Sequence, residues 1–399
     1  MTSTRFTQAP STTDSAFPWA PLLALSLATF VTVTSEMAPA ALLPQMGEGL
    51  GVSQARVGLL VSAWALTIVV SSLPLVRLTA NIARRTLLFG SLAFVGVASI
   101  VTAAAPTYPI ALVSRVAGAT AHGLFWSIVI VYAGSIVADR QVGRAISVVL
   151  AGPTLAGIVG VPVASAIGTS AGWRLVFWVL AALTAIAAVV LRMILSTPVD
   201  PVREQPDRTR WDVSAARVIG VAVLGSMILV GHFAAFTYVS PLLTEVGGFA
   251  RNEVGPLLFA FGVAGAVGLA AAGFLSDRVP RFALVLTAWL FALALGALVL
   301  LGHDPVTSVL AMLVWGALIG LFPPVFQAQV LRTASAGFRP TAGAIVVTAV
   351  NLGIASGAWL GGLVVSGPGT GRLALLAASV VMGAALTLTA LAARAPERA

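Results

Sequence analysis

Cysteine is missing from this chain, and charge is scarce in it. None of the 399 residues is cysteine, which excludes disulfides, thiolate metal sites and thiol nucleophiles. Only 9% of the residues are charged, whereas 59% are hydrophobic, and the mean hydropathy is +1.02. These values lie far outside the range of soluble globular proteins. The chain is therefore predicted to be an integral membrane protein.

The residue sets that support enzymatic chemistry are missing as well. The sequence offers no nucleophile with a partnered base, no histidine or carboxylate set at metal-ligand spacing, and no Walker sequence. We therefore expect no catalytic residue, no metal, no cofactor and no use of ATP.

Apolar runs of about 20 residues, the length that crosses a bilayer as a helix, recur along the whole chain. The first run is too long for a cleaved signal and lacks a small-residue cleavage site, so we expect it to stay as the first span. The predicted spans cover residues 19–43, 54–76, 86–105, 108–137, 145–169, 174–196, 217–244, 254–275, 281–301, 306–332, 340–366 and 371–393.

These spans divide into six plus six. The longest charged connection, "TPVDPVREQPDRTR" at 197–210, lies at the midpoint. The connection "GFLSDRVPR" (273–281) follows the eighth span as "VRLTANIARR" (76–85) follows the second, and internal symmetry of this kind is typical of transporters. The predicted fold is all-α, with twelve transmembrane helices in two pseudo-symmetric six-helix halves. The predicted segments are an N-terminal tail at 1–18, an N-terminal half at 19–196, a cytoplasmic linker at 197–216, a C-terminal half at 217–393 and a C-terminal tail at 394–399.

The net charge of +9 is explained by topology. All 22 basic residues are arginines, of which seventeen lie in the tails and alternate connections and four lie on the opposite side, Arg115 being within a span. Positive charge accumulates in cytoplasmic loops, so both termini are predicted to be cytoplasmic. Loops this short cannot build a groove-reading element, so no nucleic acid is expected as a partner.

Several stretches resemble a known family. "GFLSDRVPR" matches the pattern G-x-L-x-D-R-x-G-R-R of the major facilitator superfamily except that Pro280 replaces a glycine, and in the first copy Ala80 replaces the aspartate. "TSEMAPAALLPQM" (34–46), "SRVAGATAHGLFWSI" (114–128) and "GHFAAFTYVSPLL" (231–243) are similar to stretches of its twelve-span drug:proton antiporter branch, most of all to bacterial sugar efflux transporters. The resemblance covers essentially the whole chain. It implies the major facilitator fold, a bacterial inner-membrane location, and export of sugar-like solutes or amphipathic drugs in exchange for protons.

Glu36 is the one acidic residue deep within a predicted span. A charge in lipid costs about 3 kcal/mol on insertion scales, so such a residue usually faces a cavity and has a task. Thr32, four residues earlier, lies on the same helix face. Because desolvation disfavours the charged form of a carboxyl group, Glu36 is a candidate for proton exchange or substrate binding. The alternative is an acid that only anchors the outer end of the first span.

Arginine and histidine interrupt the spans too. Arg115 begins the fourth span, with His122 and Trp126 near the same face, and the resemblance links an arginine at this place to proton transfer. His122 and His232 lie in opposite halves, where an imidazole can bind a hydroxylated solute or relay protons. The alternatives are an arginine that reaches the surface and histidines that only join helices by hydrogen bonds.

The remaining substrate candidates are aromatic and amide side chains in the seventh and eleventh spans. Such groups stack on a ligand or fix its orientation in a mostly apolar pocket, although aromatic residues at helical spacing are also common in packing. Glu36 and Arg115 are predicted to couple protons. The predicted substrate contacts are Thr32, Glu36, His122, Trp126, His232, Phe236, Tyr238 and Asn351.

Two further features are expected to serve the movement of the halves. Small residues every four positions in the fifth and eleventh spans, Gly152 to Gly168 and Ala349 to Gly361, are predicted to be helix-packing surfaces, and the resemblance implies that these two spans lie at the interface between the halves. Charged residues at the cytoplasmic side are predicted to form gate contacts that break between conformations, although topology alone also accounts for the arginines. These gate residues are Arg84, Arg85, Asp277, Arg278 and Arg281.

The sequence thus predicts a monomeric exporter, whose partners are protons, a small-molecule substrate and the lipid bilayer. A proton gradient would supply the energy. Alternatives within transport are a proton-independent facilitator and an uptake carrier, because resemblance of fold does not fix direction. A non-transporting sensor on the same fold is the alternative from another class, although the short tails leave no room for a signalling domain.

Overall fold

The computed structural model describes residues 17–138, 141–195, 212–279, 282–301, 304–335 and 338–394. Within these ranges the chain is helical and has no strand. Eleven of its helices are long and apolar enough to cross a membrane, and Ala283–Leu298 is a shorter apolar helix at the place of the ninth predicted span. The predicted all-α fold of twelve spans is confirmed. The predicted tails and linker lie largely outside the described residues.

The first six spans form what we call the N-half. Its first span is followed by a short extra helix, and its fifth contains one π-helical turn between Pro153 and Pro162. The elements are α1 (Trp19–Ala41), α2 (Leu43–Leu50), α3 (Gln54–Leu78), α4 (Arg84–Ala104), α5 (Tyr108–Ser135), α6 (Val142–Leu155), η2 (Ala156–Gly160), α7 (Val161–Ala171) and α8 (Trp173–Ile194).

The last six spans form the C-half. Its first span is interrupted after Phe236 and resumes as a short helix and a π-helical turn. The elements are α9 (Ala215–Phe236), α10 (Val239–Pro241), η3 (Leu242–Val246), α11 (Val254–Arg278), α12 (Ala283–Leu301), α13 (Pro305–Thr333), α14 (Arg339–Ser366), η5 (Thr370–Arg372) and α15 (Leu373–Arg394).

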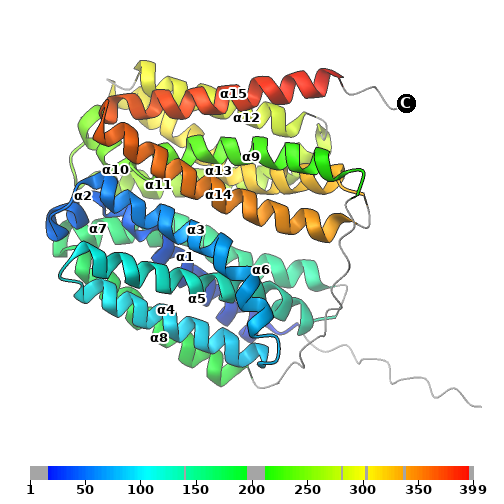
Figure 1. The fold of residues 1–399 in the computed structure, drawn as a ribbon. Helices are drawn as coiled ribbons and strands as arrows, with labels where there is room; N and C mark the ends of the chain where they lie inside the picture. Colours follow the sequence, from blue (N-terminus) through cyan, green and yellow to red (C-terminus); the bar gives the residue numbers. More distant parts are fainter. Residues whose placement is uncertain are drawn as a thin grey trace, which may run out of the picture.

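The spans run between two ends of the bundle. α9 begins and α15 ends at what we call the terminal end, whereas α2 and α10 lie at the opposite, far end (Figure 1). Two helices that begin at the far end are capped by side chains. Each capping side chain accepts a hydrogen bond from a backbone N–H group that has no acceptor within the helix. Ser53 Oγ accepts from Arg56 N at 3.3 Å, and Asp304 Oδ2 accepts from Thr307 N at 2.9 Å.

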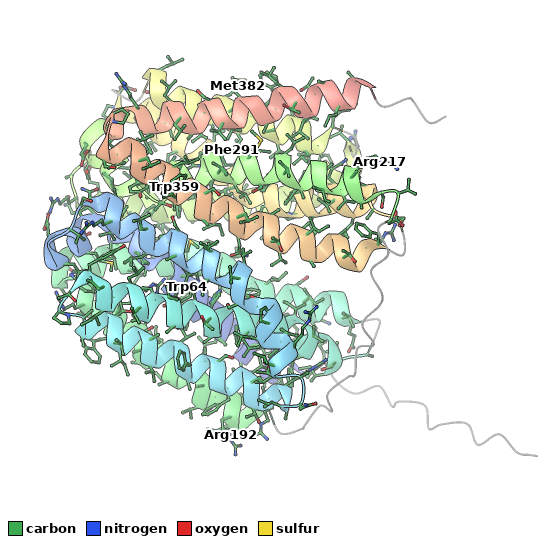
Figure 2. The ribbon with its side chains drawn as sticks, viewed as in Figure 1. Trp64, Arg192, Arg217, Phe291, Trp359 and Met382 are labelled. Carbon is green, nitrogen blue, oxygen red and sulfur yellow. The ribbon has the colours of Figure 1, made fainter. Side chains whose placement is uncertain are left out.

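Each half buries its own apolar core. Trp64 lies in the interior of the N-half and Phe291 in that of the C-half (Figure 2). In the N-half, α1 packs against α6, α8 and α3, and α5 packs against α3 and α4. This arrangement brings the apolar helices α1, α3 and α5 together and encloses the polar residues that they carry.

The halves meet near the far end. Helix α3 packs against α14, and the segment from η2 through α7 packs against α11. A Cβ built at Gly262 of α11 would lie 2.6 Å from the carbonyl oxygen of Gly157, so the two backbones are in direct contact. In Figure 1, α3 and α14 lie together at the far end and diverge toward the terminal end.

The small-residue stripes are packing surfaces, as predicted, but each faces a helix of its own half. A Cβ at Gly152 would overlap Thr29 of α1, and one at Gly160 would overlap Thr34. Gly353 and Gly357 of α14 likewise lie against α9. A Cβ added at Gly353 would lie 2.7 Å from Leu229 Cβ, and one at Gly357 would lie 2.5 Å from Val230 O. Both stripes therefore pack helices within one half. Spacing by four indicates that a backbone is approached closely, but it does not say by which helix.

Candidate functional site

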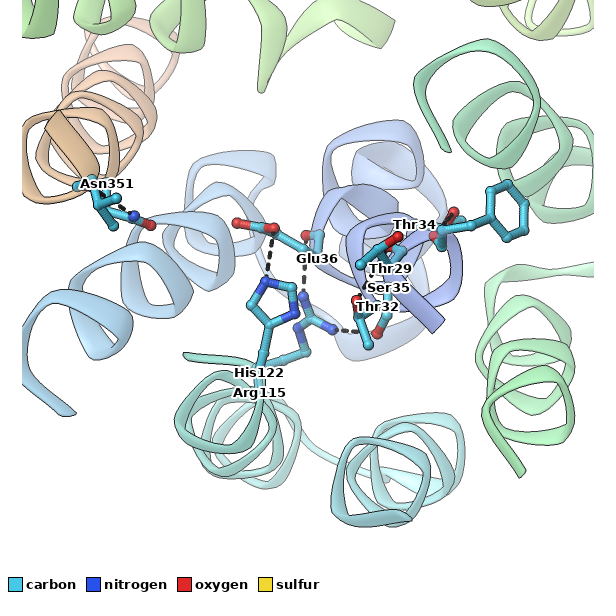
Figure 3. A network of polar contacts seen from close by, with 10 residues as sticks. Thr29, Thr32, Thr34, Ser35, Glu36, Arg115, His122 and Asn351 are labelled. Atoms are coloured by element: carbon cyan, nitrogen blue, oxygen red, sulfur yellow. Dashed lines mark hydrogen bonds and ion pairs between the residues drawn. The ribbon is translucent and has the colours of Figure 1, made fainter. Parts of the chain in front are cut away.

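Glu36 lies on α1, about one and a half turns before the far end of that helix, and is only 7% exposed. Its Oε2 atom is 3.3 Å from Nε2 of His122 on α5. Figure 3 shows the carboxylate and the imidazole pointing toward one another across the contact of α1 with α5. A buried carboxylate that has a titratable partner can change its charge state without being left alone in an apolar medium.

Arg115, about two turns into α5, is 2% exposed and points into the same region. One guanidinium nitrogen donates to Ser35 Oγ at 3.3 Å, and another donates to the backbone carbonyl of Glu36 at 3.1 Å. The guanidinium thus holds the turn of α1 that carries the carboxylate. Arg115 lies in the interior of the N-half and does not extend to the surface.

An aromatic pair encloses these charges. The guanidinium carbon of Arg115 lies 3.9 Å from the ring centroid of Trp64 on α3, a distance typical of a cation–π contact. The ring of His122 is 5.3 Å from that of Trp64 and 6.2 Å from that of Trp126. The site is therefore built mainly from α1, α3 and α5, with Phe177 of α8 5.8 Å from the Arg115 guanidinium, and these residues all belong to the N-half.

Three nitrogen atoms of this cluster are buried and have no hydrogen-bond partner among the described residues. They are Arg115 Nε, His122 Nδ1 and Trp64 Nε1. Buried polar groups are normally satisfied, so unpartnered ones at one place mark a functional candidate. With Nε2 directed at Glu36, the free Nδ1 of His122 can accept a hydrogen bond from a hydroxyl group or take up a proton.

Thr32, predicted to share the face of Glu36, has a different surrounding. Its hydroxyl donates to the carbonyl of Thr29 at 3.2 Å, and Thr29 in turn donates to Val149 O of α6 at 2.9 Å. These hydroxyl groups lie on the side of α1 that packs on α6. The structure brings Glu36, Arg115, His122 and Trp126 together, and it places Thr32 next to them along α1 without direct contact.

His232 lies in the core of the C-half, apart from the Glu36 cluster. Trp315 Nε1 donates to its Nδ1 at 3.0 Å, and the ring of Phe236 stacks on it with centroids 5.2 Å apart. Phe233 and Phe291 meet the imidazole edge-on. His232 and Phe236 thus belong to one aromatic cage inside the C-half.

Tyr238 and Asn351 lie on the side of the C-half that faces the N-half. The hydroxyl of Tyr238 donates to Ala358 O of α14 at 3.0 Å. Asn351 donates from its side-chain amide to Val347 O at 3.0 Å. In Figure 3, Asn351 projects from α14 toward α1 and Glu36. Asn351 lies about three turns, or roughly 16 Å, before Gly362 on α14, which places it near the middle of that helix.

The predicted gate residues make no contact between the halves among the described side chains. Arg85 donates to Arg192 O at 2.8 Å, which joins α4 to α8 within the N-half. Arg278 lies 5.7 Å from the Phe274 ring on its own helix. The side chain of Asp277 and the whole of Arg281 lie outside the described residues. The gate contacts stay a prediction.

Trp64 and Ser35 are parts of the cluster that sequence reasoning missed. Trp64 sits in the apolar run of α3, where an indole has no signal that separates it from ordinary packing. Ser35 is next to Glu36 and small, and its role depends on the rotation of α1. Among the described residues, no group of three or more histidine, cysteine, aspartate or glutamate side chains could hold a metal.

Comparison with known proteins gives one consistent result. The model of the Major Facilitator Superfamily matches residues 25–337 and 221–399. The chain is 34% identical over 366 residues to a "Chloramphenicol efflux pump" of Mycobacterium tuberculosis (strain CDC 1551 / Oshkosh), with 87% of each protein covered. It is 29% identical over 368 residues to a "Probable sugar efflux transporter" of Helicobacter pylori (strain G27), with 92% of each covered. Its fold is similar to the crystal structure of a D-xylose-proton symporter, with a TM-score of 0.76 at 15% identity, covering 94% of this chain and 97% of that one.

Proposed function

The chain belongs to the major facilitator superfamily and is thus a multi-pass membrane transporter and not an enzyme, and we propose that it exports small neutral molecules in exchange for protons. The observation that carries this proposal is the pair of Glu36 and His122, 3.3 Å apart in the membrane interior. Helices this apolar have no structural need for a carboxylate at that depth.

Exchange requires that proton and substrate bind the same site in turn. In this proposal Glu36 takes up a proton when the site faces outward, and the interaction between its carboxyl group and His122 then weakens. Substrate entering from the cytoplasm binds the imidazole, which returns Glu36 to its charged form and releases the proton inward. Arg115 positions the carboxylate throughout, because it binds the backbone of Glu36 and not its carboxyl group.

Neutral, hydroxylated or aromatic substrates fit the chemistry of the cluster. A cationic drug needs an unpaired carboxylate, whereas Glu36 already has His122 beside its carboxylate and the Arg115 guanidinium 3.1 Å from its backbone carbonyl. The free Nδ1 of His122 suits a substrate hydroxyl, and the Trp126 ring next to His122 offers an aromatic face. Two relatives are named for chloramphenicol efflux and sugar efflux, which agrees with this class. Asn351 would contact the substrate from the C-half.

The orientation follows from the arginines. Seventeen of the 22 arginines lie on the side of the termini, so the terminal end is proposed to be cytoplasmic in a bacterial inner membrane. The halves touch at the far end, so this conformation would be the one open to the cytoplasm. In the opposite conformation the terminal end closes, and Arg84, Arg85, Asp277, Arg278 and Arg281 would then meet. One chain supplies both halves, so a monomer suffices.

The test is proton movement in everted membrane vesicles that contain the wild type, Glu36→Gln or the control Glu253→Gln. Glu253 is an exposed acid at the far end, where its Oε2 accepts from Ala250 N. Pentoses, thio-galactosides and chloramphenicol are added one at a time to vesicles that hold a proton gradient. The proposal expects at least one compound to dissipate the gradient with the wild type and Glu253→Gln but not with Glu36→Gln.

The other outcomes contradict parts of the proposal. An equal response of all three proteins would make Glu36 structural. Compound uptake without proton movement would indicate a facilitator. A response to cations such as ethidium, with none to the neutral compounds, would overturn the proposed substrate class.

A further inference from the structure

Tyr238 is a C-half residue whose side chain packs in a cluster made mostly of N-half residues. It is 0% exposed and packs in a cluster with Val57 and Leu60 of α3 and Leu42 at the far end of α1. The neighbours of Tyr238 in sequence, Phe236 and Val239, pack in a different cluster, made mostly of C-half residues. This tyrosine therefore crosses the boundary between the halves.

The backbone around Tyr238 is shaped to present this side chain. α9 ends at Phe236, and α10 begins at Val239 with Tyr238 as its N-cap residue, at φ −111° and ψ 28°. The N–H of Tyr238 donates to Ala235 O, and its carbonyl accepts from Leu242 N. An uninterrupted helix would direct residue 238 elsewhere on the helix surface, since each residue is rotated by a fixed angle.

The hydroxyl group of Tyr238 is enclosed by two glycines from different halves. A Cβ built at Gly58 of α3 would overlap the hydroxyl oxygen, and one at Gly362 of α14 would lie 2.6 Å from it. Gly362 also faces Ala55 O of α3, at 3.6 Å for the same construction. Only a residue without a side chain fits at Gly58 while Tyr238 occupies this place.

Tyr238 contacts residues of both halves. The hydrogen bond from its hydroxyl ends on Ala358 O, in the C-half, so the ring is fixed to the half that carries it. Its contact with Gly58 joins the two halves and is lost when they separate. Helix packing also joins the halves, through α3 with α14 and α7 with α11, and a polar link at the far end is the ion pair of Arg251 with Glu48 at 3.1 Å, whose side chains are 62% and 64% exposed. Exposed pairs contribute about 0–1 kcal/mol.

We propose that Tyr238 is a latch, fixed to the C-half, whose insertion against Gly58 holds the far end closed during transport. The transport cycle then needs the latch to leave Gly58 before the far end opens, and to return before the terminal end opens. Tyr238 serves this role in place of the substrate contact that the sequence predicts. The inference rests on the transporter fold alone, so it stands even where proton coupling through Glu36 fails.

The test uses the natural lack of cysteine in this chain. Spin labels are attached at Arg56→Cys and Asn252→Cys, which are exposed far-end positions of the N-half and the C-half. Distances between the labels are measured by pulsed electron paramagnetic resonance in lipid nanodiscs. The compared proteins are wild type, Gly58→Ala, Tyr238→Ala, the double variant, and Gly90→Ala, a helical glycine at which a Cβ would meet nothing within 4 Å.

If Tyr238 holds the far end closed, the wild type and Gly90→Ala should show a population with a short distance between the two spin labels. Gly58→Ala shifts most of this population to longer distances, because the new methyl group occupies the place of the hydroxyl. The double variant Gly58→Ala/Tyr238→Ala should match Tyr238→Ala alone and be less open than Gly58→Ala, because the new methyl group then has no hydroxyl to overlap, a partial rescue that a general loss of folding cannot produce. Tyr238→Ala alone reduces the short population without an overlap at residue 58, and so tests the latch where Gly58→Ala fails to fold.

Three results would overturn the latch. One is a distribution that Gly58→Ala and Tyr238→Ala leave unchanged. Another is a double variant that stays as open as Gly58→Ala. The third is a wild type without a short-distance population, since the latch would then hold nothing closed.

Discussion

The Nε2 atom of His122 lies 3.3 Å from Oε2 of Glu36, between helices that are otherwise apolar. The contact joins the first and fourth spans of one half, so both partners move together when the halves rock. What changes during the cycle is therefore the charge of the pair and its access to substrate, not the distance between two domains. This property suits a site that must hold either a proton or a substrate.

Replacement of His122 by glutamine tests whether the imidazole takes part in exchange. A glutamine amide can still donate to Glu36, but it cannot be protonated or accept through an Nδ1 atom. We expect proton-coupled export to fall on the order of tenfold, which corresponds to about 1.4 kcal/mol. Initial rates of export at matched expression give the measurement.

The same substitution in the Glu36→Gln background supplies the control for coupling. If the two residues act as one unit, His122→Gln has little further effect there, because neighbours in contact are non-additive. Independent, additive losses would contradict a shared role.

Arg115 is predicted to be a stability determinant of the site. Lysine cannot reach both Ser35 Oγ and Glu36 O in the fork geometry of arginine, and it stacks less well on Trp64. Arg115→Lys should lower the free energy of unfolding by about 2 kcal/mol, since hydrogen bonds to charged groups contribute about that much. Thermal unfolding of the purified proteins in one detergent measures the change.

Arg174→Lys is the matched control for that experiment. Arg174 donates to a single carbonyl, Ala105 O, at 3.0 Å near the far end, and lies over Trp173. A smaller loss is expected there because one acceptor is affected and water can replace the donor. Equal losses of unfolding free energy at both positions would show that Arg115 does no more than join two helices, as Arg174 does.

The contact of α6 with α1 leaves no room for a side chain at Gly152. A Cβ there would overlap Thr29 Oγ1 and the carbonyl of Ser26. Gly152→Ala should therefore cost about 1–3 kcal/mol, the range for overpacked interiors. Gly157→Ala, where a Cβ meets nothing within 4 Å, should change stability little. The midpoints of thermal unfolding of the two variants decide the matter, and similar midpoints would contradict the packing assigned to α6.

Asp212 at the terminal end gives a prediction on pH. The hydroxyl of Ser335 donates to its Oδ2 at 2.7 Å, and the N–H and hydroxyl of Ser214 donate to its Oδ1. These hydrogen bonds, that of Ser335 foremost, lower the pKa of Asp212 below its ordinary value of 3.8. A lowered pKa contributes stability that is present above 3.8 and is lost as pH falls through the lowered value.

Ser335→Ala removes the largest cause of that shift, so the pKa of Asp212 should move back toward 3.8. The acid-side loss of stability, which begins near pH 3.8 in both proteins, should then be smaller than in the wild type and end at a higher pH, so the acid end of the profile is displaced. Thermal unfolding followed from about pH 7 to about pH 3 shows this displacement. Acid profiles that superimpose for the two proteins would contradict the assignment to Ser335.

The spans were predictable because the bilayer imposes one rule on every helix that crosses it. Backbone polar groups must be satisfied internally and side chains must be apolar, so length and hydropathy suffice to find each span. Polar exceptions to that rule, Glu36, Arg115 and His122, were found for the same reason. The structure brings these three together.

The partners of these residues were not predictable, because they depend on how each helix is rotated about its axis. Trp64 has no sequence signal, yet it lies against Arg115. The four-residue stripe of α6 and α7 faces α1 and not the other half. Tyr238 leaves the course of its helix at a break that hydropathy does not reveal.

The most direct test of the account is the number of protons released when substrate binds to purified protein. Chloramphenicol and a pentose are titrated calorimetrically into the wild type and into Glu36→Gln, in two buffers of different ionisation enthalpy, so that binding and proton release are obtained together. The account predicts that the wild type releases up to about one proton per bound molecule, as linkage between the two ligands requires, and that Glu36→Gln binds the same compound without release. Equal proton release from the two proteins, or binding by the wild type with no release, would contradict the claim that Glu36 exchanges a proton for the substrate.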